Sequence, residues 1–187
     1  MSGDAACRPL LFLDVDGPLN PYVARSGPPE GYITVEVPQE DRAATEPSWP
    51  RFRERPRRVW LNPAHGRALL GLGYDLCWAT AWMSEANSII GPVVGLPELP
   101  YVDFAGDLFR ERQDGIHWKS APLPAYADGR PFAWVDDEQN EVEHVYVAAR
   151  HAAPALLHDV DPGVGLRDED LAVLRKFAAS LSGPTGR

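Results

Sequence analysis

Short apolar segments recur along this chain and are separated by stretches with a helical or irregular pattern. Five of them are almost continuously apolar, which is typical of strands buried on both faces of a sheet: residues 10–13, 74–79, 101–104, 132–135 and 155–158. Helices are predicted over residues 63–72, 83–90, 120–127, 141–149 and 167–182. Strands that alternate with helices predict a parallel sheet with right-handed crossovers, that is, an α/β fold.

An insertion rich in proline and charge, residues 20–62, separates the first strand from the first helix. Within it, residues 32–37 alternate apolar and polar positions, which predicts a strand, and residues 59–61 are its expected partner. The stretch 38–58 is expected to be loop, and the tail 183–187 is expected to be disordered. A length of 187 residues suits a single domain over 1–187 in which the insertion forms a small flap.

Two aspartates stand where the first strand ends. Asp14 and Asp16 are two positions apart and are followed at once by Gly17. The carboxyl ends of strands are where ligands bind in open α/β sheets. Two acids at one strand tip repel each other unless a cation or a shared proton relieves them. Taken alone, the fragment has a second interpretation, an exposed Asp-Gly turn after a buried strand.

Three later fragments of the chain carry further polar residues that bear on this choice. Thr80 ends the second apolar segment, Lys119 lies in the fragment IHWKSAPL, and Asp136 and Asp137 follow the fourth apolar segment. In this order the fragments resemble the motifs of the haloacid dehalogenase (HAD) superfamily of phosphotransferases, over about residues 10–181. One departure is Pro18, which stands where the family usually has threonine or a similar residue. The proline removes a backbone donor and fixes φ just after the acidic loop.

The resemblance implies a three-layer α/β/α Rossmann-like fold with five parallel strands in the order fifth, fourth, first, second, third. That order would bring the acids after the first and fourth strands to one crevice. It also implies a Mg²⁺-dependent phosphatase that works through an aspartyl-phosphate. Within the family, an acid at the position of Asp16 marks phosphatases and mutases, and dehalogenases lack it. A non-catalytic HAD-fold protein that binds a phosphorylated ligand or a protein partner is the competing hypothesis.

The family motifs imply a role for each catalytic position. Asp14 would be the nucleophile, and Asp16 would protonate the leaving oxygen and then activate water. Thr80 would hydrogen-bond a phosphoryl oxygen, and Lys119 would hold the Asp14 carboxylate. Each has a plainer interpretation: a threonine that ends a strand, or a solvated surface lysine. Only two lysines stand against 16 arginines in the chain, which favours the functional interpretation of Lys119.

The resemblance also implies a ligand set for Mg²⁺, a hard cation that prefers oxygen ligands. Asp14, the backbone carbonyl of Asp16, and Asp136 are the carried-over ligands. Asp137 would bind through water or orient Lys119. The alternative for Asp136 and Asp137 is an acidic turn that caps a helix.

Substrate contacts are expected from Trp82 and from the arginine-rich part of the insertion, chiefly Arg57 and Arg58. Clustered guanidinium groups bind phosphates in bidentate fashion. The expected substrate is a phosphorylated small molecule or a phosphorylated nucleic-acid end, because the chain is also similar to HAD domains of RNA-repair proteins. The alternative is a solvated, charged loop that balances the many acids.

Composition narrows the functional classes. A formal charge of −9 argues against a general nucleic-acid or membrane-surface binder, and 44% hydrophobic content is that of a soluble globular protein. No apolar run reaches the 18 residues of a spanning helix, and the first residues lack the features of a signal peptide. Two cysteines imply no disulfide framework. We expect a cytoplasmic protein, and the oligomeric state stays open.

Overall fold

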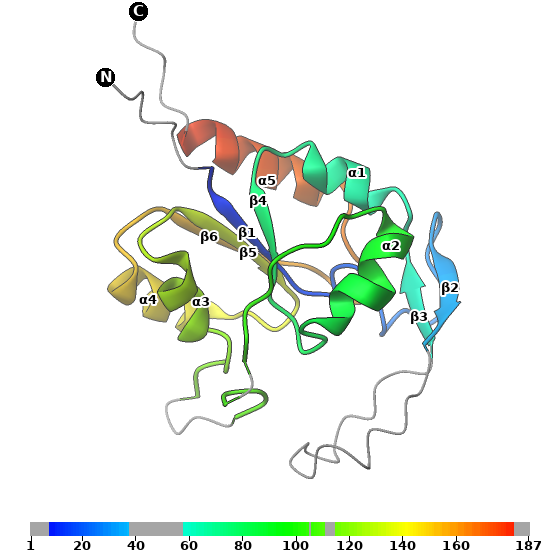
Figure 1. Ribbon diagram of the computed structural model, residues 1–187, viewed down its shortest axis with the longest axis horizontal. Helices are drawn as coiled ribbons and strands as arrows, with labels where there is room; N and C mark the ends of the chain where they lie inside the picture. Colours follow the sequence, from blue (N-terminus) through cyan, green and yellow to red (C-terminus); the bar gives the residue numbers. More distant parts are fainter. Residues whose placement is uncertain (1–7, 38–57, 105, 111–114, 182–187) are drawn as a thin grey trace, which may run out of the picture.

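The computed structural model describes residues 8–37, 58–104, 106–110 and 115–181 (Figure 1). Its main sheet has four parallel strands in the order β4-β1-β5-β6. Their bounds are Leu10–Leu13 (β1), Asp75–Trp78 (β4), Phe132–Asp136 (β5) and Ala155–Asp159 (β6). The predicted α/β class is therefore confirmed, and these four strands have the neighbours that were expected of them.

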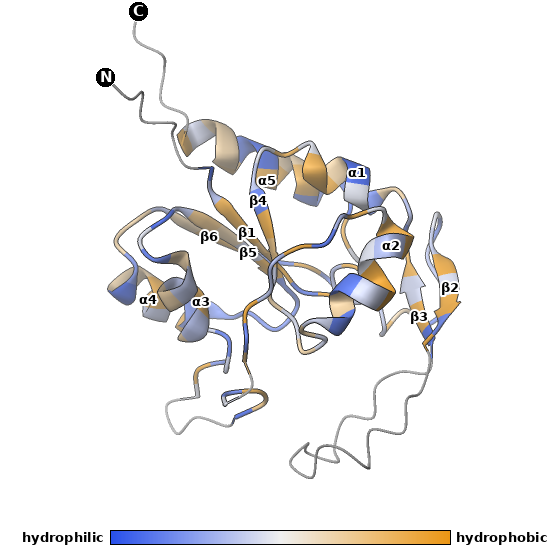
Figure 2. Cartoon of the chain, viewed as in Figure 1, coloured by the Kyte–Doolittle hydropathy of each residue, from blue (hydrophilic) through white to orange (hydrophobic). Residues whose placement is uncertain are grey.

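Helices cover both faces of this sheet. Side chains alternate along β1, so that Leu11 and Leu13 pack in one hydrophobic cluster and Leu10 and Phe12 in another. The first cluster includes residues of the helices His65–Leu70 (α1) and Asp168–Leu181 (α5), and the second includes residues of Pro122–Ala127 (α3) and Glu141–Arg150 (α4). Figure 2 shows the hydrophobic residues gathered along the central strands. The continuous apolar pattern of β1 thus follows from burial on both faces.

Four helices lie close to their predicted positions: His65–Leu70 (α1), Pro122–Ala127 (α3), Glu141–Arg150 (α4) and Asp168–Leu181 (α5). A further helix, Gly91–Val94 (α2), was not predicted. The helix expected over 83–90 begins later, as the π-helical turn Ala86–Ile90 (η2) that leads into α2, because Met83 has a φ of +47°. In the part of the chain that the structure describes, no helix is long and apolar enough to cross a membrane.

The insertion contains a two-stranded antiparallel hairpin, with strands Ile33–Glu36 (β2) and Arg58–Leu61 (β3). Both strands were predicted, but Arg58 belongs to β3 and not to the loop. It pairs with Glu36 in the register of the hairpin. The rest of the expected loop, residues 38–57, and the expected disordered tail, 183–187, lie outside the described residues.

The strand expected over residues 101–104 does not form, so the main sheet has four strands among the described residues and not five. Only Tyr101 pairs with β4, through an isolated parallel bridge to Trp78. Pro100 precedes it and has no N–H to continue a ladder, although its carbonyl accepts from the Trp78 amide. Val102 and Phe104 are buried. The apolar pattern of this segment therefore reflects packing against the sheet.

Candidate functional site

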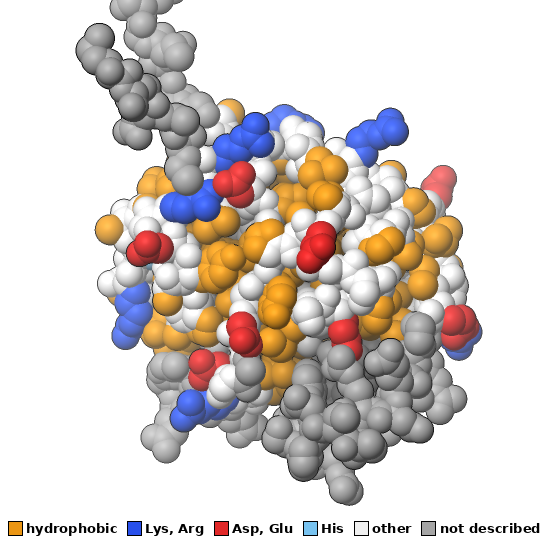
Figure 3. Space-filling model, viewed as in Figure 1, with side chains coloured by type: hydrophobic (Ala, Val, Ile, Leu, Met, Phe, Trp, Pro, Cys, Tyr) orange, Lys and Arg blue, Asp and Glu red, His pale blue; other side chains and the backbone are white. Residues whose placement is uncertain are grey.

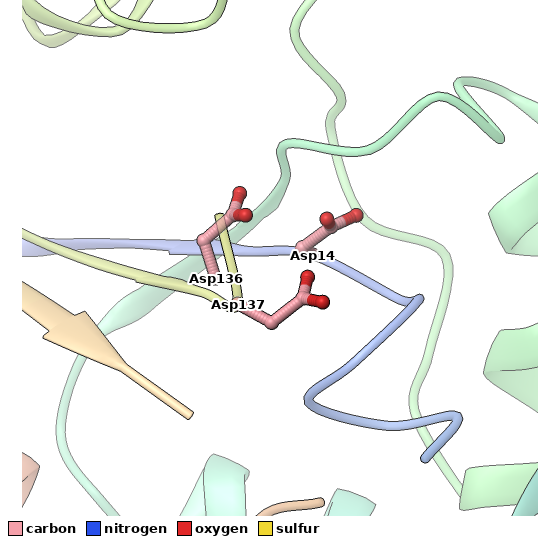
Figure 4. A group of neighbouring side chains, drawn as sticks. All are labelled: Asp14, Asp136 and Asp137. Atoms are coloured by element: carbon pink, nitrogen blue, oxygen red, sulfur yellow. The ribbon is translucent and has the colours of Figure 1, made fainter. Parts of the chain in front are cut away.

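Three aspartates meet at the carboxyl edge of the sheet. Asp14 follows β1, Asp136 ends β5, and Asp137 is the next residue; β1 and β5 are hydrogen-bonded neighbours. The three side chains lie side by side, as Figure 4 shows, and one oxygen from each lies within 4.8 Å of the others. Asp136 is fully buried and Asp14 is nearly so. The acids after the first and fourth predicted strands therefore lie together, as expected, because those strands are neighbours in the sheet.

Lys119 lies between two of these carboxylates. Its Nζ donates to Asp14 Oδ2 and to Asp136 Oδ2, each at 2.6 Å. Burial lowers the pKa of Lys119, but the charges of Asp136 and Asp14 outweigh it and raise that pKa above its usual value. Since Lys119 is only 1% exposed, the alternative of a solvated surface lysine is wrong.

A buried glutamate that sequence analysis missed anchors the segment carrying Lys119. Glu143 accepts the backbone N–H of His117 and that of Asn140, each at 2.9 Å. The Nε2 atom of His117 lies 3.1 Å from Oε2 of Glu138, the residue that follows Asp136 and Asp137 in the chain. Asn140 and Glu143 are three positions apart, which is the sequence signal of a capping box, so their pairing at the start of α4 could have been predicted. The contact of Glu143 with the distant His117 could not have been predicted from a local pattern.

Asp137 lies at the exposed side of the cluster, where its Oδ2 accepts the hydroxyl of Tyr22 at 3.0 Å. Burial, and then the neighbouring charge of Asp136, raise the pKa of Asp137 to about 7. Gly17 passes directly beside this carboxyl group. It has a φ of +86°, and a Cβ built on it would lie 2.4 Å from Asp137 Cγ. The glycine after the two acids is therefore required by space as well as by conformation.

The Asp16 carboxylate stands outside the three-acid group. Its Oδ1 accepts from Asn20 Nδ2 at 2.8 Å, and its Oδ2 accepts from Trp82 Nε1 at 2.9 Å. Trp82 is only 2% exposed, and the expectation that it contacts substrate stays a prediction. Thr80 is also buried, and its Oγ1 accepts the backbone N–H of Trp82 at 3.3 Å.

Of the arginines predicted to contact substrate, Arg58 alone lies among the described residues. Arg57 lies outside the described residues, as do the other arginines of the cluster before Arg58. Arg58 is exposed on the hairpin. A substrate role for these arginines stays a prediction.

The charge of the site favours a cation. Burial raises the pKa of Asp14, and Asp136 and Asp16 raise it further, against the opposing effect of Lys119. Mg²⁺ binds oxygens at about 2.1 Å in an octahedron, so that adjacent ligands lie about 2.9 Å apart and opposite ones about 4.2 Å apart. One oxygen from each of the three carboxylates lies within 4.8 Å of the others, a looser grouping than that octahedron. The three acids could hold a hard divalent cation if their side chains moved closer together.

Two hollows of the surface, of about 440 and 570 Å³, lie at the outer edge of β4. Both adjoin Leu99 and Pro100, and neither is lined by Asp14, Asp136 or Asp137. Figure 3 shows hydrophobic side chains spread over one face of the molecule. The chemistry-bearing residues are thus concentrated at the strand tips and not in these apolar hollows.

Comparisons of this chain with protein-family models, with curated proteins and with solved structures found no match. Function has to be inferred from the arrangement of residues at the strand tips. Three carboxylates and one buried ammonium, brought together from distant parts of the chain, form that arrangement.

Proposed function

We propose that this chain is a Mg²⁺-dependent phosphatase of the HAD type that hydrolyses phosphomonoesters through an aspartyl-phosphate on Asp14. The observation that carries the proposal is the setting of Asp14 at a strand tip. A buried ammonium holds one of its oxygens, and two further acids lie close by. A nucleophilic carboxylate beside a fixed cation suits attack on a phosphoryl group, where negative charge must be neutralised.

The arrangement of the sheet supports the HAD assignment. The four strands have the order that the resemblance implies, and the isolated bridge at Tyr101 lies beside β4, where the strand expected over residues 101–104 would be. The motif positions at Asp14, Thr80 and Asp136 follow or end three neighbouring strands of this sheet. Pro18, the departure from the family pattern, leaves both acids of the first motif at the site.

The proposed reaction has two steps. An oxygen of Asp14 bonds to phosphorus while the bond from phosphorus to the leaving oxygen breaks, and that oxygen takes a proton from Asp16. Water then gives a proton to Asp16 while its oxygen bonds to phosphorus, which frees Asp14 and releases inorganic phosphate. The Thr80 hydroxyl oxygen accepts the Trp82 amide, and its O–H would donate to a phosphoryl oxygen.

Asp14, the backbone carbonyl of Asp16, and Asp136 would hold the cation, and Asp137 would bind it directly or through water. A bound Mg²⁺ would neutralise charge on the phosphoryl oxygens. Lys119 supplies a fixed positive charge from the protein itself. Because it contacts Asp14 and Asp136 together, it keeps the nucleophile and a metal ligand in one orientation.

The test is release of phosphate from p-nitrophenyl phosphate with and without Mg²⁺, by wild-type protein and by Asp14→Asn. We expect turnover that requires the metal and is lost in the variant. A second readout needs no substrate: fluoroberyllate forms tetrahedral adducts with carboxylates, and ¹⁹F NMR should detect one with the wild type and Mg²⁺ only. Turnover that survives Asp14→Asn, or a folded wild type with neither turnover nor adduct, would contradict the proposal.

A further inference from the structure

Asp16 is held at both oxygens by side chains from different segments of the chain. Asn20 belongs to the loop after β1, and Trp82 to the loop after β4. Both side chains are 2% exposed, so water competes little for these hydrogen bonds. A carboxylate held by two buried donors keeps one rotamer, because turning its side chain would leave buried N–H groups unpaired.

Asn20 also connects Asp16 to the hairpin. Its Oδ1 accepts the backbone N–H of Trp60, in β3, at 3.0 Å, while its Nδ2 donates to Asp16. The backbone of Asn20 is fixed as well, since its N–H donates to Val15 and its carbonyl accepts from Gly17. One buried amide thus joins the acidic loop, the hairpin and the Asp16 carboxylate.

We propose that Trp82 and Asn20 are positioning residues for Asp16, and that through it they set how well the enzyme cleaves substrates with poor leaving groups. This inference rests on the proposed phosphatase function. Each carboxyl oxygen has two lone pairs, so a donated N–H at an oxygen is compatible with proton transfer through the same group. The two donors therefore fix the orientation of the Asp16 carboxyl group.

The leaving group distinguishes a positioning role from a structural one. An alkoxide leaves poorly and needs a proton as its bond to phosphorus breaks, whereas p-nitrophenolate leaves readily without one. General acid catalysis contributes about 10²- to 10⁴-fold when it is required. A misdirected Asp16 should therefore slow the hydrolysis of an alkyl phosphate far more than that of an aryl phosphate.

The experiment compares kcat/KM for glycerol phosphate and p-nitrophenyl phosphate with saturating Mg²⁺. Trp82→Phe keeps an aromatic ring and removes the N–H donor. We expect it to lower the alkyl-to-aryl ratio of kcat/KM by roughly tenfold or more, mainly through kcat. In the Asp16→Asn background, Trp82→Phe should cause no further fall in that ratio, because the two changes remove one function.

Trp78→Phe is the matched control. Trp78 is also buried, but its Nε1 donates to Asn87 Oδ1 at 2.8 Å and not to the site. We expect the alkyl-to-aryl ratio to stay at the wild-type value. Asn20→Asp is a second test in case Trp82→Phe does not fold. It keeps the acceptor for the Trp60 amide and replaces the donor to Asp16 by an oxygen, so the ratio should fall.

Equal loss on both substrates in Trp82→Phe, or additive losses in the double variant, would overturn the positioning role. An effect confined to KM would do the same and would restore Trp82 as a substrate contact. If wild-type protein released phosphate from neither substrate, the proposed function would fail, and this inference with it.

Discussion

The Lys119 ammonium lies 2.6 Å from a carboxylate oxygen of Asp14, although 105 positions separate the two residues in the chain. The same nitrogen lies 2.6 Å from Asp136. All three side chains are buried, so the protein has taken one positive and two negative charges out of water. Such a group is costly to break, because the loss of one partner leaves the others without compensation.

Replacing Lys119 should destabilise the fold more than replacing Asp14. Lys119→Met leaves two buried carboxylates facing each other, and we expect the free energy of unfolding to fall by roughly 3–5 kcal/mol in metal-free buffer. Asp14→Asn removes a charge that burial already disfavours, and Lys119 keeps Asp136 as its partner. Urea unfolding of both variants at pH 7 measures the contrast. Equal losses would show that the ammonium does not hold the acids together.

Gly17 should tolerate alanine far less well than Gly73. Both have positive φ, +86° and +83°, but an added Cβ meets the Asp137 side chain at Gly17 and nothing within 4 Å at Gly73. Gly73→Ala should therefore show only the conformational cost, roughly 1–2 kcal/mol of unfolding free energy. Gly17→Ala should lose more than that and should also weaken Mg²⁺ binding, measured by calorimetry. Matching losses in the two variants would rule out a role for this close approach.

The strand tips were predictable because burial leaves a clear pattern in the sequence. An unbroken apolar run such as 10–13 is buried on both faces, and polar residues directly after it have to lie at the edge of the sheet. The sheet order could not be read from periodicity and came from the resemblance. It then placed Asp14 beside Asp136, as β1 and β5 are neighbours.

A side chain's neighbours are set by tertiary packing, which the sequence pattern does not reveal. Trp82 follows Thr80 and was expected to contact substrate; its indole is buried against Asp16, and the substrate contact stays a prediction. The apolar pattern at 101–104 predicted a strand, but only Tyr101 pairs with β4, because β4 itself ends at Trp78. No local pattern linked Tyr22 to Asp137, which lie 115 positions apart.

Removing the Tyr22 hydroxyl should weaken metal binding with little effect on folding. Tyr22 is 47% exposed, and its hydroxyl donates to Asp137, which lowers the pKa of that carboxyl against the effects of burial. In Tyr22→Phe the pKa of Asp137 should rise further, so more of it carries a proton at pH 7. We expect Mg²⁺ affinity to fall about two- to tenfold, as the loss of one hydrogen bond of ~0.5–1.5 kcal/mol would cause. Unchanged affinity by calorimetry at pH 7 would argue against Asp137 as part of the metal site.

Acid and metal should compete for the same carboxyl groups, because acid protonates them and Mg²⁺ binds their ionised form. The pKa of Asp137 is about 7 in the folded protein, whereas an unfolded aspartate has a pKa near ~3.9. Below pH ~4 the group is protonated in both states and costs nothing. Between pH ~4 and about 7, Asp137 has lost its proton in the unfolded chain but keeps it in the folded protein. The metal-free protein therefore loses stability as the pH rises through this range. The raised pKa of Asp14 acts in the same direction.

The stability of metal-free Asp137→Asn relative to wild type should therefore increase from pH 5 to pH 8, since the variant lacks this titration. Mg²⁺ needs ionised ligands, so its stabilising effect on the wild type should grow over the same range and release protons. Thermal unfolding of both proteins at pH 5, 6.5 and 8, with and without Mg²⁺, gives both quantities. Because other titrating groups are common to the two proteins, the difference between their melting temperatures isolates Asp137. A difference that does not change with pH would mean that the Asp137 carboxyl titrates as it does in the unfolded chain.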